Sequence, residues 1–342
     1  MKQFLIPEEG RFYKANLHCH TTFSDGRATP EEIKEIYKSH GYSVVAFTDH
    51  NIQVPHPELA DPDFLPLTGV EYNINDEGYP GKDRDVKTTH LCLIALRDDI
   101  RYQVCYTDSY VHHGGARSHI PESMINPDEP DFERRYGAEC ANAMIKAGRD
   151  AGYFVTYNHP SWSQENWSHY MKLEGLSAME IVNFGCLNEG YDDYNSRVYR
   201  DMLCGGKRLF CIAADDNHNK YPVGHPRCDA LGGWVMIKAE KLEYNTVGRA
   251  LEKGNFYSST GPEIRSLWFE DGKICADFSP AVAVDCITGV KKCFRAGRIG
   301  GEPFTHAEFD IKPWFRWIRL RIIDREGNAA DTNAYFTEEL AF

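Results

Sequence analysis

The segment from residue 16 to residue 26 reads Asn16-Leu17-His18-Cys19-His20-Thr21-Thr22-Phe23-Ser24-Asp25-Gly26. In an extended chain His18 and His20 point to the same face, because they are two residues apart, and Cys19 points to the other face. Two imidazoles on one face can bind the same metal ion. A single pair of this kind also occurs among structural and surface histidines, so other segments must decide between the two interpretations.

Apolar runs elsewhere in the chain end at side chains of the types that bind metals. Candidate strands cover residues 44–48, 65–70, 90–96, 153–157, 178–184 and 209–214. Four of them lead into Asp49-His50, Glu71, His159 and Asp216-Asn217-His218, whereas His90 stands at the start of its run. Such buried strands predict a parallel sheet, and active sites of parallel barrels lie at the carboxyl ends of the strands. The sequence therefore predicts that these side chains meet.

Helical patterns alternate with the candidate strands. The clearest one follows Thr29, with Pro30 at the first helical position, Glu32 in the place that a capping box requires, and Gly41 as its end. Further helices are expected over residues 138–151, 194–204 and 242–253. Strand and helix in alternation are typical of an α/β barrel or a doubly wound sheet.

The pattern changes after Ser259-Thr260-Gly261-Pro262. Runs of period two, such as residues 317–322, are followed by turn-like stretches such as residues 324–328. We expect a small antiparallel β-sandwich here, and divide the chain into residues 1–258 and residues 259–342. The connection 97–133 fits neither period, and connections of this length are usually functional lids or disordered.

Composition restricts the class of protein. The 342 residues suffice for about two domains. With 42% apolar and 26% charged residues, a packed core is expected. The net charge of −13, from 38 basic and 51 acidic residues, repels nucleic acid and anionic membranes.

The sequence contains no apolar run long enough for a membrane span and no signal-peptide pattern at its start, so we expect a cytoplasmic protein. The 11 cysteines, without Cys-x-x-Cys spacing, indicate reduced thiols.

Taken together, the motifs resemble those of the PHP (polymerase and histidinol phosphatase) superfamily of metal-dependent hydrolases. They are His18-x-His20 with Ser24-Asp25-Gly26, Thr48-Asp49-His50-Asn51, Gly69-Val70-Glu71, His159-Pro160 and Asp216-Asn217-His218. The resemblance implies a distorted seven-stranded β/α barrel with metals at the carboxyl ends of the strands. The junction 257–262 and the stretch 327–333 resemble, more loosely, a two-domain branch that includes proteins similar to carbaryl hydrolase, which cleaves esters and carbamates.

The resemblance also implies a ligand set for two or three divalent ions. The first metal would be held by His18, His20, Glu71 and Asp216; the second by Glu71, His90 and His159; the third by Asp25, His50 and His218. A two-metal site remains if His90 is misplaced. Nitrogen and oxygen ligands favour Mn²⁺, Fe²⁺ or Zn²⁺. Asp215, where the family often has Ser, and Asn217, where a small residue is usual, depart from the family pattern around the site.

Such a centre would be cationic inside an acidic protein. Three divalent ions bring about +6 and the three carboxylates −3, which leaves about +3. A metal pair lowers the pKa of bound water to about 7 and can present a bridging hydroxide to phosphorus. We therefore expect a phosphoric ester hydrolase (EC 3.1) that acts on a small phosphorylated metabolite, such as a nucleotide or sugar phosphate. No oligomeric state is predicted.

Two other functions are compatible with the same residues. One is hydrolysis of a carboxylic ester, carbamate or amide at the same metal site, and the other is a metal-bound binding or regulatory module without turnover. DNA processing is disfavoured, because the sequence contains neither a polymerase-like domain nor a basic stripe with interleaved aromatic residues.

Further residues are candidates for supporting roles, each with a simpler alternative. Asp49 either orients His50 or caps a turn. In the long connection, His112, His113 and His119 either supply a general acid or substrate contact, or are exposed loop residues. Arg117, Lys220 and Arg227 either grip a substrate phosphate or are solvated surface charges.

Overall fold

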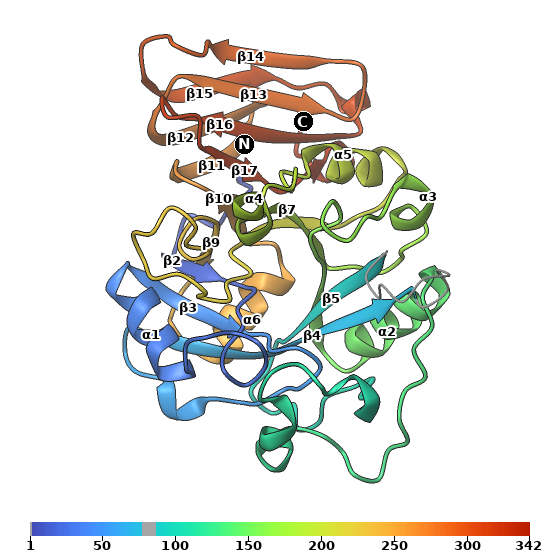
Figure 1. The fold of residues 1–342 in the computed structure, drawn as a ribbon. Helices are drawn as coiled ribbons and strands as arrows, with labels where there is room; N and C mark the ends of the chain where they lie inside the picture. Colours follow the sequence, from blue (N-terminus) through green and yellow to red (C-terminus); the bar gives the residue numbers. More distant parts are fainter. Residues whose placement is uncertain (1, 77–86) are drawn as a thin grey trace.

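A computed structural model describes residues 2–76 and 87–342 of the chain. Strands and helices alternate over most of the first 259 residues (Figure 1). The strands are β1 (Gln3–Phe4), β2 (Arg11–Asn16), β3 (Tyr42–Phe47), β4 (Leu65–Asn75), β5 (Thr88–Ala95), β6 (Tyr153–Tyr157), β7 (Ala178–Asn183), β8 (Phe210–Ala214), β9 (Trp234–Ala239) and β10 (Phe256–Ser259). The helices are α1 (Pro30–Ser39), α2 (Ala138–Asp150), α3 (Trp167–Tyr170), α4 (Phe184–Glu189), α5 (Ser196–Cys204) and α6 (Tyr244–Glu252). The six predicted strands and four predicted helices are confirmed, with small shifts of their ends.

The remaining strands form the upper part of Figure 1. They are β11 (Ile264–Glu270), β12 (Lys273–Ala281), β13 (Ala283–Thr288), β14 (Cys293–Gly297), β15 (Phe304–Asp310), β16 (Trp317–Ile323), β17 (Ala329–Thr332) and β18 (Tyr335–Phe336). Among the described residues, one sheet has the order β1-β11-β12-β15, and the larger one runs β14-β13-β16-β17-β10-β9-β2-β3-β4-β5-β6-β7-β8. The protein is thus a mixed α/β structure with a separate antiparallel sheet.

The direction of β5 differs from the sequence-based expectation. β2, β3 and β4 are parallel to one another, as are β6, β7 and β8, but β5 is antiparallel to both β4 and β6. The expectation of a parallel sheet was therefore wrong for β5, which pairs with β4 as the second strand of a hairpin. Because β5 runs the other way, its first residues lie at the edge where β4 and β6 end, and His90 pairs with Asn73.

The C-terminal strands enclose an apolar core to which Tyr257 of β10 also contributes. Its side chains come from both sheets and include Leu267, Phe269, Val284, Leu320 and Ile322, all fully buried. β17 pairs with β10, so these strands continue the larger sheet, while β1 from the chain's beginning pairs with β11 in the smaller one. The short β1 therefore lies with the C-terminal strands.

The long connection between β5 and α2 contains short 3₁₀ turns at Asp108–Tyr110 and Ala116–Glu122. Its side chains Val111 and Ala116 pack against Ile52 and Val54. The N–H of Gly115 also donates to the carbonyl of Ser24 at 3.0 Å. The connection is therefore packed against the loop that carries Asp25.

No helix in the described parts of the chain combines the length and apolar character that crossing a membrane requires.

The capping box predicted for α1 is confirmed. The Glu32 N–H donates to Thr29 Oγ1 at 3.3 Å, and the Thr29 N–H donates to the Glu32 carboxylate at 2.8 Å. Thr29→Ala removes the first of these contacts and should lower the free energy of unfolding by about 1 kcal/mol, measured by urea denaturation. Ser39→Ala, at the other end of the helix, serves as the control. Equal stability of Thr29→Ala and the wild type would contradict the role of the cap.

Candidate metal centre

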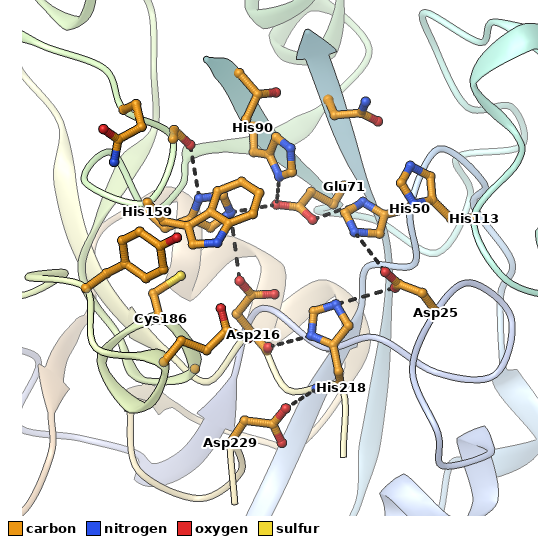
Figure 2. A pocket seen from close by; sticks show the side chains of 18 of the residues that line it. Asp25, His50, Glu71, His90, His113, His159, Cys186, Asp216, His218 and Asp229 are labelled. Carbon is orange, nitrogen blue, oxygen red and sulfur yellow. Dashed lines mark hydrogen bonds and ion pairs between the residues drawn. The ribbon is translucent and has the colours of Figure 1, made fainter. Parts of the chain in front are cut away.

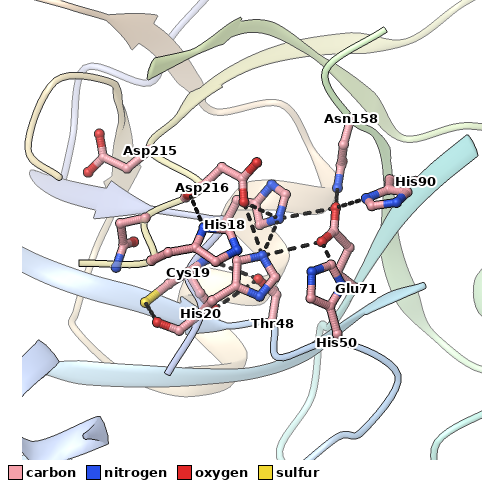
Figure 3. Close-up of polar contacts among 12 residues, drawn as sticks. His18, Cys19, His20, Thr48, His50, Glu71, His90, Asn158, Asp215 and Asp216 are labelled. Carbon is pink, nitrogen blue, oxygen red and sulfur yellow. Dashed lines mark hydrogen bonds and ion pairs between the residues drawn. The ribbon is translucent and has the colours of Figure 1, made fainter. Parts of the chain in front are cut away.

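The nine predicted ligand residues come together at one edge of the larger sheet (Figures 2 and 3). His18 and His20 follow β2, His50 follows β3, His159 follows β6, and the Asp216–His218 segment follows β8. Glu71 and His90 lie within β4 and β5. Parallel strands bring their carboxyl ends to a common edge, and the reversed direction of β5 brings its beginning there as well.

Three sets of side chains each place their ligand atoms within 4.8 Å of one another. We refer to them as the first group (His18, His20, Glu71, Asp216), the second group (Glu71, His90, His159) and the third group (His20, Asp25, His50, His218). Glu71 belongs to the first two groups and His20 to the first and third. The groups are thus linked by shared members.

The first group surrounds one buried carboxylate oxygen. Asp216 Oδ1 lies 3.1 Å from His18 Nε2 and 3.0 Å from His20 Nε2. Glu71 approaches the same two nitrogens at 3.2 Å, with Oε1 toward His18 and Oε2 toward His20. Two imidazole nitrogens and two carboxylates therefore converge on one point.

The second and third groups lie on either side of Glu71. His90 Nδ1 and His159 Nε2 approach Glu71 Oε1 at 3.0 and 3.2 Å, and Figure 2 shows Glu71 between these rings and His50. In the third group, Asp25 lies 3.4 Å from His218 Nε2 and 3.8 Å from His50 Nε2.

Two buried atoms of the centre have no hydrogen bond within the described protein. Asp216 Oδ1 and His50 Nδ1 are both buried, and the close approaches to them lack hydrogen-bond geometry. Buried polar atoms normally have a partner, because desolvation without one is costly. Lone pairs that converge without hydrogen bonds are what a metal ion would satisfy, and nitrogen and oxygen donors suit Mn²⁺, Fe²⁺ or Zn²⁺. The residues therefore fit divalent metal ions.

The charges of the centre support the same interpretation. Burial raises the pKa of Glu71, but the imidazoles of His18, His90 and His50 outweigh it and hold that pKa well below its usual range. Conversely, burial lowers the pKa of His159, but hydrogen bonding to Glu71 and the Asp216 charge raise it to about 9. Carboxylates and imidazoles in this arrangement require positive charge between them, which protons or metal ions can supply.

Sequence reasoning missed one member of the cluster. Glu180 lies in β7, is fully buried, and shares a fourth set of close ligand atoms with His18 and His159. Its carboxylate approaches His18 Nδ1 at 2.7 Å. The available signal was a single acidic residue inside the otherwise uncharged strand Ala178–Asn183, where an unpaired charge would be costly.

The supporting histidines of the long connection have different surroundings. His113 stacks on His50 with 4.4 Å between ring centroids, and its buried Nε2 has no hydrogen bond within the described protein. Burial lowers the pKa of His113 to about 4. His112 is exposed and contacts the Ser109 carbonyl, and His119 pairs with Glu122 and stacks on Phe23. Only His113 of the three lines the cavity described below.

The three candidate phosphate-binding cations also have different surroundings in the structure. Lys220 lines the cavity, 3.8 Å from Glu189. Arg117 is exposed and paired with Asp108, and Arg227 stacks on Tyr221. Neither arginine is among the described residues that line the cavity. The expectation that Arg117 and Arg227 grip substrate there is therefore not supported by their positions, because other partners hold both side chains.

Asp49 contacts a turn of the backbone. It accepts hydrogen bonds from the Thr21 N–H at 2.8 Å, the Thr21 hydroxyl at 2.8 Å and the Ser24 hydroxyl at 2.6 Å. These contacts match the turn-capping alternative and fix the segment between His20 and Asp25.

A cavity of about 560 Å³ opens onto the three groups. Asp25, Glu71, His90 and Asp216 form part of its wall, and Lys87 and Lys220 are its described lysines. Aromatic and polar side chains complete it, including Trp162, Tyr191, Gln164 and Cys186. The cavity gives a small molecule access to the centre.

Because Glu71 belongs to both the first and the second group, its loss should affect more of the bound metal than the loss of a ligand of one group. The wild type should bind two or three ions, and three when each group holds one. His218→Ala should lose only the ion of the third group, whereas Glu71→Ala should lose those of the first and second. Metal per chain is measured by mass spectrometry after dialysis, with His306→Ala, on β15, as the control. Equal metal content in all four proteins would contradict the grouping.

Comparison with known proteins adds a likeness of fold. No family model matches the sequence, and no curated protein sequence matches it. A solved two-domain protein containing a predicted PHP-like metal-dependent phosphoesterase, from Bacteroides vulgatus, is 12% identical, with a TM-score of 0.46 over 97% of this chain and 98% of that one. A candidate metal-dependent phosphoesterase from Bifidobacterium adolescentis is 16% identical (TM-score 0.38, 66% and 94% covered). An amidohydrolase from Chromobacterium violaceum with bound sulfate is 15% identical (TM-score 0.36, 57% and 84% covered). The first of these solved proteins, which contains a predicted PHP-like metal-dependent phosphoesterase, is similar to this chain over nearly the whole length of both.

Proposed function

We propose that the protein is a metal-dependent hydrolase that cleaves phosphoric esters of small metabolites, such as nucleotide or sugar phosphates. The observation that carries this proposal is the convergence of three groups of nitrogen and oxygen donors, linked through Glu71 and His20, at the wall of a cavity. Two or three divalent ions, Mn²⁺, Fe²⁺ or Zn²⁺, would be held by the nine residues of the three groups. When bound, such ions lower the pKa of water and act as Lewis acids toward phosphoryl oxygens.

The charge balance of the centre favours an anionic substrate. Asp25, Glu71 and Asp216 contribute −3, and Glu180 adds a further −1 that the sequence-based sum omitted. With three divalent ions the centre keeps a charge of about +2, so it attracts phosphate. Lys87 and Lys220, in the cavity wall, extend this positive region toward the entrance and would bind the non-reacting phosphate oxygens.

His113 is the supporting residue best placed to contact a substrate. It lines the cavity next to His50, and its pKa of about 4 keeps the ring neutral near pH 7. A neutral imidazole can hydrogen-bond a substrate or leaving-group oxygen without adding charge. His113, rather than His112 or His119, would therefore orient the leaving group.

The scaffold for this activity would be a distorted barrel followed by a C-terminal domain. Closure would bring β8 against β9 and β10, which is supported by the hydrogen bond from Ser258 Oγ to the Cys211 carbonyl at 2.8 Å. The division into residues 1–258 and 259–342 is part of the same proposal. A cytoplasmic location is supported by 11 cysteines that all remain free thiols.

A carboxylic ester, carbamate or amide hydrolase is the second candidate function. One observation favours it: Trp162 lines the cavity and packs edge-on against His159, with 4.9 Å between ring centroids. With Tyr191 it gives the cavity an apolar wall, against which an uncharged ester could bind.

A direct comparison of substrates tests the proposed reaction. The protein should release p-nitrophenol from p-nitrophenyl phosphate much faster than from p-nitrophenyl acetate, and EDTA should abolish this activity until Mn²⁺, Fe²⁺ or Zn²⁺ is restored. His20→Ala and Asp216→Ala should be inactive, because each removes a ligand of the first group, whereas His306→Ala should retain activity. Faster cleavage of the acetate would favour the second candidate, and full activity of both ligand variants would contradict the site.

The lysines of the cavity wall make a separate prediction. Lys220→Met and Lys87→Met should each raise KM for a phosphate ester about twofold to fivefold, with a small change in kcat, because exposed ion pairs contribute up to about 1 kcal/mol. Arg117→Met is the matched control, since it removes a cation of the neighbouring connection that Asp108 already holds. KM values unchanged in both lysine variants would contradict their role in phosphate binding.

A further inference from the structure

Glu180 is a buried acidic residue for which the nine-ligand centre has no assigned use. Every residue of its strand β7 is buried, and Glu180 itself has no exposed surface. A buried carboxylate is strongly unfavourable unless hydrogen bonds or opposite charges compensate for its lost hydration. Its partners should therefore explain why the strand contains it.

The partners of the Glu180 carboxylate are all positioned to donate. Oε1 lies 2.7 Å from His18 Nδ1. Oε2 accepts from the His159 main-chain N–H at 2.8 Å and from Asn183 Nδ2 at 2.9 Å. The His159 N–H and Asn183 Nδ2 can only donate, and His18 Nδ1 donates when it carries a proton. An ionised carboxylate therefore satisfies all three contacts at once.

The contact with His18 determines which ring nitrogen can bind a metal. A proton held on Nδ1 leaves Nε2 with a lone pair, and Nε2 is the atom that faces Asp216 and Glu71 in the first group. Metal-binding histidines generally donate their other ring N–H to such a partner, which fixes the tautomer and orients the ring.

The contact with His159 acts on the backbone. His159 has φ of +24°, a left-handed conformation that side-chain-bearing residues rarely adopt. The Glu180 carboxylate holds its N–H at this bend, directly before Pro160. Asn183 then continues the network, because the same Nδ2 that contacts Glu180 lies 3.1 Å from Asp216 Oδ2.

We propose that Glu180 is a positioning residue that holds the Nδ1 proton of His18, so that Nε2 stays available to a metal ion, and at the same time fixes the main chain of His159. One carboxylate from β7 thereby positions His18, a ligand of the first group, and His159, a ligand of the second. The proposal rests on the proposed metal-dependent function. It differs from direct ligation by Glu180, in which a metal ion would displace the Nδ1 proton.

The unmodified protein provides the first test. Its histidines are labelled with ¹⁵N, and the ring signals are recorded in metal-free protein and during titration with Zn²⁺, with His18 assigned by the loss of its signals in His18→Gln. The Nδ1 proton of His18 should be present in both states. Loss of this proton when Zn²⁺ binds would overturn the proposal, because Glu180 would then be a ligand; its absence from the metal-free protein would overturn it as well.

The second test compares metal affinities. In Glu180→Gln the amide can no longer accept all three hydrogen bonds, so the affinity for Zn²⁺, measured by competition with a chromophoric chelator, should fall by about tenfold to a hundredfold. Glu165→Gln is the matched control, because Glu165 is also a buried carboxylate and contacts His169 at 2.7 Å, outside the three groups. Its affinity should equal that of the wild type.

The outcomes separate this proposal from the function on which it rests. Equal Zn²⁺ affinity of Glu180→Gln and Glu165→Gln would overturn the positioning role. If Glu180→Gln does not fold, the ring signals of the unmodified protein still decide. Failure of the wild type to bind Zn²⁺, Mn²⁺ or Fe²⁺ would contradict the proposed function itself, and that result is obtained before any variant is compared.

Discussion

The structure depends on the mutual compensation of buried charges at one edge of the larger sheet. Glu71 and Glu180 are removed from water together with the rings of His18 and His20, which would be prohibitive for any one of them alone, and Asp216 is largely buried beside them. They are tolerated because each carboxylate faces imidazole nitrogens within hydrogen-bond range, yet some of these approaches lack hydrogen-bond geometry. Divalent cations among these atoms would complete the compensation, and this requirement connects the fold to the proposed function.

The rest of the architecture positions these groups. Asp49 fixes the turn between His20 and Asp25, and Asp229 accepts the N–H groups of His218 and Asn219 at 2.8 and 3.0 Å (Figure 2). Asp215, next to the ligand Asp216, accepts hydrogen bonds from the main chain at Leu231 and from two further N–H groups after it. Acidic side chains that do not point into the cluster thus anchor the loops around it.

Much of this arrangement could be predicted from the sequence, for identifiable reasons. Apolar runs that end in His, Glu or Asp indicate both a strand and its functional end, so the helices, the strands and ligand types such as His50, Glu71, His159 and Asp216 were accessible from the pattern. The full set of nine residues was implied only by the resemblance to the PHP superfamily. The direction of β5 could not be predicted, because a buried strand has the same composition whether its neighbours are parallel or antiparallel to it. His90 therefore appeared out of place. Glu180 was hidden because its position inside an apolar strand gives no motif. The surroundings of Arg117 and Arg227 could not be predicted either, because the charge of an arginine does not reveal its partner. Arg117 pairs with Asp108, and Arg227 stacks on Tyr221.

The central claim is that these buried groups form a centre for divalent metal ions, and crystallography tests it most directly. Crystals of the protein soaked in Mn²⁺ should show anomalous difference peaks between His18 Nε2, His20 Nε2 and Asp216 Oδ1, and between Glu71, His90 and His159. An anomalous map without peaks among these atoms, in crystals whose side chains are placed as described, would contradict the account.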